Sequence, residues 1–164
     1  MNKKPLILVF DDAWATRRSV LEPLISDQAE VRDVSFFTQE SLEKGEAGVF
    51  LPPGLIVEAK PSAIIVDLAI VPSLEGAWDQ GIRLLRILSD QSELREVPIL
   101  VVSDYAKNPQ AKALLEKASI NLKGLFEWSD LQELDTEKLR FKKTIEDILR
   151  SRNVSEEEPV KSEC

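Results

Sequence analysis

The stretch "LILVFDDAW", residues 6–14, runs five apolar residues directly into two adjacent aspartates, Asp11 and Asp12. An uninterrupted apolar run of this length is typical of a strand that is buried on both faces of a parallel sheet, whereas a half-exposed strand alternates. We therefore predict a buried strand that ends at Asp11, with two carboxylates at its carboxyl end.

Two further segments have the same form, because "AIIV" precedes Asp67 and "VPILVV" precedes Ser103. Weaker strand candidates lie at residues 30–37 and 123–128. Helices are expected at residues 16–26, 82–90, 109–119 and 135–151. Strands that alternate with helices predict right-handed β-α-β crossovers and a three-layer α/β domain. The connections at 38–61 and 68–80 are long, and we expect the second to be functional.

Composition narrows the class of protein. The 164 residues, 43% of them hydrophobic, predict one domain over residues 1–150, followed by a disordered acidic tail at 151–164. The net charge of −8 argues against nucleic-acid binding, and no apolar run is long enough for a membrane helix. The only cysteine is Cys164, so an intramolecular disulfide is excluded and a cytoplasmic location is expected.

The polar residues at the strand ends predict a shared site, since ligands of parallel α/β sheets bind at the carboxyl ends of the strands. Each pair of carboxylates near 4 Å costs roughly 4 kcal/mol at an effective dielectric constant of about 20, so a cation is required. Oxygen ligands of this kind select Mg²⁺. One carboxylate can then attack a phosphoryl group, and the Ser103 hydroxyl can donate a hydrogen bond to it.

The segments "VFDD", "IIVD", "GIRLLRIL" and "PILVVSDYAK", with a final strand and helix, together resemble the receiver domain of bacterial response regulators over about residues 4–150. The resemblance implies a doubly wound, flavodoxin-like sheet of five parallel strands in the order 2-1-3-4-5. It also implies roles for five residues: Asp67 as phosphoryl acceptor, Asp11, Asp12 and Asp67 as Mg²⁺ ligands with the backbone carbonyl of Ala69, and Ser103 as the switch hydroxyl.

The same resemblance implies partners and a reaction. Histidine is absent from the chain, so the phosphohistidine donor would belong to a histidine kinase or a phosphotransfer protein. Enzymatic activity would be limited to Mg²⁺-dependent self-phosphorylation and dephosphorylation of the aspartate. Output would pass to a downstream protein target by protein contact, and a homodimer through the fourth helix, fifth strand and fifth helix is one expected assembly.

One departure from the family leaves a second interpretation open. Receiver domains place a lysine followed by proline at the end of the fifth strand, whereas "GLFEWSDL" offers Glu127 or Trp128 there. Lys107 is a candidate substitute from the neighbouring loop. The missing lysine favours the alternative of a pseudo-receiver, a protein-interaction module that works without phosphorylation.

Other residues and classes are interpreted more simply. Two placements are open to Arg17 and Arg18, one directed toward the acidic pocket and one solvated on the helix, and we favour the second because most such arginines are solvated. The tryptophans Trp14, Trp78 and Trp128 are expected to cover helix edges and anchor loops rather than to bind a ligand. A haloacid dehalogenase would need an aspartate at the position of Ala13, and the chain has neither glycine-rich nucleotide-binding motif.

Overall fold

A computed structural model describes residues 4–11, 13–33, 53–68 and 79–157. Its sheet has five strands: β1 (Leu6–Phe10), β2 (Glu30–Asp33), β3 (Ala63–Val66), β4 (Pro98–Ser103) and β5 (Asn121–Glu127). Every neighbouring pair is parallel, and the strand order is β2-β1-β3-β4-β5. The predicted fold class and strand order are therefore confirmed.

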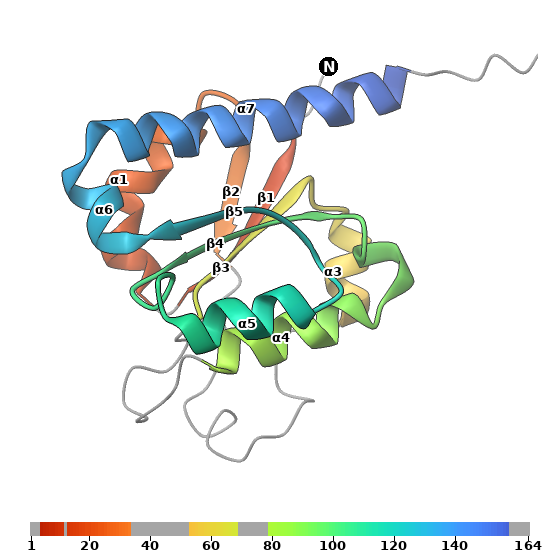
Figure 1. The fold of residues 1–164 in the computed structure, drawn as a ribbon. Helices are drawn as coiled ribbons and strands as arrows, with labels where there is room; N and C mark the ends of the chain where they lie inside the picture. The colour runs from red at the N-terminus through yellow and green to blue at the C-terminus, as the bar shows by residue number, and fades with distance from the viewer. Residues whose placement is uncertain (1–3, 12, 34–52, 69–78, 158–164) are drawn as a thin grey trace, which may run out of the picture.

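Helices cover both faces of this sheet (Figure 1). They are α1 (Trp14–Ile25), α3 (Pro53–Ala59), α4 (Asp79–Ser89), α5 (Pro109–Lys117), α6 (Trp128–Glu133) and α7 (Asp135–Glu157), with a 3₁₀ turn at Ser92–Leu94. The helices α1, α6 and α7 lie on one face, and α3, α4 and α5 lie on the other. No helix in the described part of the chain is both long and apolar enough to cross a bilayer.

Each face of the sheet has its own hydrophobic core, because neighbouring residues of a strand point to opposite faces. The α4 core combines Leu8, Phe10, Ile64, Val66, Ile99 and Val101 of the sheet with residues of α3, α4 and α5. The α7 core combines Ile7, Val9, Ile65, Leu100, Val102 and Phe126 with residues of α1, α6 and α7. All of β1, β3 and β4 is consequently buried except Leu6, as their unbroken apolar sequences predict.

The first helix begins earlier than predicted. Its sequence allows Thr16 to cap a helix that starts there, but α1 starts at Trp14, with Ala13 at the N-cap position. The turn is closed by backbone bonds from Trp14 N–H to Asp11 O (3.2 Å) and from Arg17 N–H to Ala13 O (3.0 Å), so Thr16 already lies inside the helix. This short connection brings the first turns of α1 close to the carboxyl end of β1.

The last helix differs from the prediction in its face and in its end. In the sequence, Leu139 recurs with Ile145, Ile148 and Leu149 at helical spacing, which predicts a shared face. In the structure, Leu139 is 67% exposed, and the fully buried Phe141 takes its place beside Ile145 and Ile148. Those three residues share one helical face, because they are three or four positions apart. The helix also continues to Glu157, past the predicted start of a tail at residue 151, while 158–164 lie outside the described residues.

Candidate functional site

An acidic residue stands at the carboxyl end of every strand of the sheet. We call this set the acidic rim: Asp33 ends β2, Asp11 follows β1, Asp67 follows β3, Asp104 follows β4 and Glu127 ends β5. Because all five strands are parallel, these residues lie along one edge of the sheet. The paired residues Phe10 and Val66 of β1 and β3 directly precede Asp11 and Asp67, which places these two aspartates side by side at its centre.

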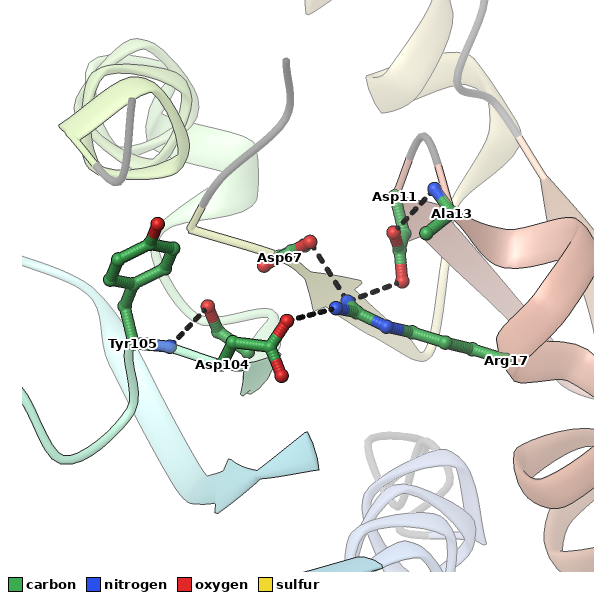
Figure 2. A network of polar contacts seen from close by, with 7 residues as sticks. Asp11, Ala13, Arg17, Asp67, Asp104 and Tyr105 are labelled. Carbon is green, nitrogen blue, oxygen red and sulfur yellow. Dashed lines mark hydrogen bonds and ion pairs between the residues drawn. The ribbon is translucent and has the colours of Figure 1, made fainter. Parts of the chain in front are cut away.

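A guanidinium group lies between the two central aspartates. Arg17 Nη1 donates to Asp11 Oδ2 at 2.9 Å and to Asp67 Oδ2 at 2.8 Å (Figure 2). The Asp11 carboxylate is also held from its other side, since Oδ1 accepts the Ala13 N–H at 2.8 Å. One nitrogen atom of α1 therefore joins the ends of β1 and β3.

These three charged residues are buried. Asp11 and Asp67 are each 2% exposed, and Arg17 is 5% exposed. Burial raises the pKa of Asp11, and the adjacent Arg17 charge only partly opposes that effect. Burial acts to lower the pKa of Arg17, but Asp67 and Asp11 outweigh it, so the pKa of Arg17 is raised overall and the guanidinium stays charged. The arginine thus supplies positive charge that the clustered carboxylates require.

Arg17 has two further neighbours, the exposed Asp104 and the buried Trp128. Its Nη2 donates to Asp104 Oδ2 at 3.4 Å, and the Asp104 side chain is 60% exposed. The guanidinium carbon also lies 5.1 Å from the centre of the Trp128 ring, a cation–π arrangement. Arg17 therefore connects α1 with the ends of β1, β3 and β4 and with the first residue of α6.

The hydroxyl predicted to act with Asp67 is at the end of the neighbouring strand. Ser103 is fully buried and ends β4, next to β3 in the sheet. Its Oγ accepts the N–H of Tyr105 at 3.1 Å, which stabilises the turn after the strand. Tyr105 itself is 38% exposed.

The end of β5 carries negative charge where receiver domains have a lysine. Glu127 pairs in register with Ser103, and its Oε2 accepts the backbone N–H of Lys107 at 3.3 Å. The ammonium group of Lys107 contacts Asp130 Oδ2 at 2.9 Å, and the Lys107 side chain is 67% exposed. Lys107 is therefore engaged with α6, and the expectation that it substitutes for the missing lysine at Asp67 is not supported.

The structure brings together three of the predicted site residues, Asp11, Asp67 and Ser103, while Asp12 and Ala69 lie outside the described residues. Trp14 and Trp128 are buried first residues of α1 and α6, as expected for anchors, and Trp78 lies outside the described residues. The expectation that Arg17 is solvated was wrong. A signal was available, because a residue in the first turns of a helix that directly follows a strand lies near that strand's end.

The described carboxylates suit a divalent cation but do not by themselves form a complete set of metal ligands. Two carboxylates that reach the same nitrogen atom are close enough to share a cation, and Mg²⁺ commonly binds through one or two carboxylates. Within 4–11, 13–33, 53–68 and 79–157, no group of three or more acidic or cysteine side chains is arranged to hold a metal ion. The other predicted ligands, Asp12 and Ala69, are not among these residues.

Comparison with known proteins identifies the fold. No family model and no curated protein matches the sequence. The phosphorylated cyanobacterial phytochrome response regulator RcpA is similar in structure, with 19% identity, a TM-score of 0.58, and coverage of 90% of this chain and 96% of that chain. A signal receiver domain of a two-component histidine kinase from Clostridium thermocellum has 11% identity, a TM-score of 0.57, and coverage of 92% and 99%.

A third similar structure, a two-component response regulator from Legionella pneumophila, has 18% identity and a TM-score of 0.51, with coverage of 88% of this chain and 99% of that chain. These likenesses span nearly the whole of each domain and agree with the observed strand order. The chain therefore has the fold of the receiver domains of two-component signalling.

Proposed function

We propose that this chain is a two-component signalling receiver in which Asp67 accepts a phosphoryl group from the phosphohistidine of a histidine kinase or phosphotransfer protein. Output passes by protein contact to a downstream target, and the protein acts in the cytoplasm. The observation that carries the proposal is that Asp67 and Asp11 both contact the Arg17 guanidinium and lie beside Ser103 at the end of the next strand.

The chemistry requires a carboxylate nucleophile and positive charge around the transferred group. An Asp67 oxygen attacks phosphorus, a P–O bond forms, and the P–N bond of the donor breaks, leaving the electron pair on the histidine nitrogen. Asp11 and Asp67, with the predicted ligands Asp12 and Ala69, would hold Mg²⁺, which would neutralise charge on the phosphoryl oxygens. Ser103 Oγ would donate its own hydrogen to one of those oxygens, since accepting the Tyr105 N–H uses only a lone pair of the hydroxyl.

The proposal is tested by incubating the protein with Mg²⁺ and acetyl phosphate and measuring intact mass. We expect wild type to gain the mass of one phosphoryl group, and Asp67→Asn to gain none because the amide is not a nucleophile. The matched control is Asp104→Asn, which removes a neighbouring acidic-rim carboxylate and should keep the modification. Wild type that stays unmodified with acetyl phosphate and with phosphorylated histidine kinases would rule the proposal out.

A second candidate is favoured by a specific observation at the end of β5. Glu127 faces Ser103 across the sheet, and the nearby Lys107 ammonium is directed to Asp130. A carboxylate there repels a phosphoryl group that a lysine would attract. The second candidate is a phosphorylation-independent interaction module. The variant Glu127→Lys distinguishes the two functions. If Glu127→Lys gains a phosphoryl group and wild type does not, the interaction module is favoured.

A further inference from the structure

We propose that Arg17 is a built-in competitor for the cation of the acidic rim, because its guanidinium holds the two carboxylate oxygens that a bound metal would need. The inference deepens the proposed function and rests on the metal site in it. It concerns which cation the site holds at rest, and it makes metal affinity a property that this arginine controls.

The first argument is that the contacts of Arg17 and of a metal coincide. Arg17 Nη1 binds the Oδ2 atoms of both Asp11 and Asp67, at 2.9 and 2.8 Å. The other Asp11 oxygen is already used by the Ala13 N–H. Oδ2 is the oxygen through which each aspartate meets the same Arg17 nitrogen, so a cation bound between these two oxygens would take the place of the guanidinium nitrogen.

The second argument concerns charge. Two buried carboxylates need one nearby cation to coexist, and Arg17 meets that need without an external ion. When a divalent ion enters as well, the guanidinium is repelled by it at close range. Arg17 must therefore leave the Oδ2 atoms as the metal binds, and the cost of that movement lowers the apparent metal affinity.

The third argument is that an alternative partner for the Arg17 guanidinium lies nearby. The exposed Asp104 carboxylate already accepts a long hydrogen bond from Nη2, on the solvent side of the cluster. The Trp128 ring lies 5.1 Å from the guanidinium carbon, so movement of the charge changes the surroundings of this indole. Trp128 fluorescence is therefore a direct reporter of the exchange.

The test compares Arg17→Gln with Arg18→Gln in the absence of any phosphoryl donor. Both variants remove one positive charge from α1, but Arg18 is exposed and pairs with Glu22 at 3.0 Å, away from the acidic rim. Affinity for Mg²⁺ is measured by isothermal calorimetry and by Trp fluorescence. We expect Arg17→Gln to bind Mg²⁺ about tenfold tighter than wild type or more, and Arg18→Gln to match wild type within about twofold.

Thermal unfolding gives a second readout. In EDTA we expect Arg17→Gln to melt below wild type, and saturating Mg²⁺ should raise its melting temperature more than that of wild type. Equal Mg²⁺ affinity in wild type and Arg17→Gln would overturn the inference, as would weaker binding or no binding by the variant. If Arg17→Gln does not fold, Arg17→Lys replaces it: a lysine cannot reproduce the bridging geometry, so Mg²⁺ should bind about threefold tighter than to wild type, and equal affinity would again overturn the inference.

This test separates the inference from the proposed function. Phosphoryl transfer to wild-type Asp67 with unchanged metal affinity in Arg17→Gln would remove the inference and leave the function standing. Tighter metal binding by Arg17→Gln, with neither protein phosphorylated, would remove the function and leave the inference standing.

Discussion

Arg140 holds Glu137 by two contacts, from Nε to Oε1 at 2.9 Å and from Nη2 to Oε2 at 2.7 Å. The side-chain hydrogen bond with Arg140 lowers the pKa of Glu137. The unfolded chain then binds more protons than the folded one, so this pair stabilises the fold above the ordinary pKa of glutamate, about 4.3, and the benefit is lost as the pH falls through the lowered value.

We therefore expect Glu137→Gln to lower the free energy of unfolding by about 0.5 kcal/mol at neutral pH, the magnitude typical of a largely exposed ion pair. The difference from wild type should vanish in acid, when Glu137 is neutral. Urea unfolding over about pH 3 to 7 measures this, with the exposed Glu133→Gln as control. A Glu137→Gln deficit that persisted or grew toward low pH would contradict the assigned pairing.

Gly81 allows α4 to approach the end of β3. A Cβ atom at this position would lie 2.4 Å from the Asp67 carbonyl oxygen and 2.5 Å from Leu68 Cα. Gly81→Ala in an unconstrained helix stabilises by up to about 1 kcal/mol, but here we expect a loss of about 1–3 kcal/mol because backbone must move. Urea unfolding decides by the sign of the change, and a stabilised variant would mean that α4 does not pack this closely.

Arg17 shows why the sequence favoured the wrong placement, the solvated one, for a residue of the site. In the sequence it is one of two adjacent arginines on a helix, and nothing local separates it from Arg18. In the fold, Arg17 is buried against a carboxylate 50 positions away, whereas Arg18 pairs with Glu22 on the same helix. Ion-pair partners at such separations depend on the tertiary arrangement of strands, which local patterns do not encode.

Helix α7 packs through Phe141, whose ring is fully buried and meets the Phe126 ring edge-on, with centroids 5.1 Å apart. We expect Phe141→Ala to lower the free energy of unfolding by about 3–5 kcal/mol, because a cavity opens between α7 and β5. Leu139→Ala is the control from the same helix: its side chain is 67% exposed, so a change within about 0.5 kcal/mol is expected. Chemical denaturation that ranked the two variants in the opposite order would refute the observed helix face.

Elements were predicted best where their sequences are unambiguous. The apolar runs of β1, β3 and β4 indicated their positions directly, because strands buried on both faces need apolar side chains throughout. Of the weaker strand predicted at residues 30–37, residues 30–33 form β2, and residues 34–37 lie outside the described residues. Helix starts and faces were predicted less well. For example, α1 begins after Ala13 with backbone hydrogen bonds only, and no capping side chain marks that position in the sequence.

The two cores share the central sheet, so we expect them to unfold together. Ile64 belongs to the α4 core and Ile65 to the α7 core, and both are buried. Replacing either with alanine should cost about 2–5 kcal/mol. With Trp78→Phe as background, Trp14 and Trp128 report only on the α7 core, yet Ile64→Ala should shift the fluorescence transition as much as the circular dichroism transition. Separate transitions by the two probes would show that the cores unfold independently.

The sequence by itself determined the layered α/β class and placed Asp11, Asp67 and Ser103 at the ends of buried strands, because periodicity and strand ends are local properties. The resemblance to receiver domains supplied the strand order, which the structure confirms. Only the tertiary structure decided which groups meet at that edge: Arg17 with Asp11 and Asp67, and Lys107 with Asp130. The partners of charged side chains depend on distance and burial in the folded chain. Both are determined when separate strands and helices pack together.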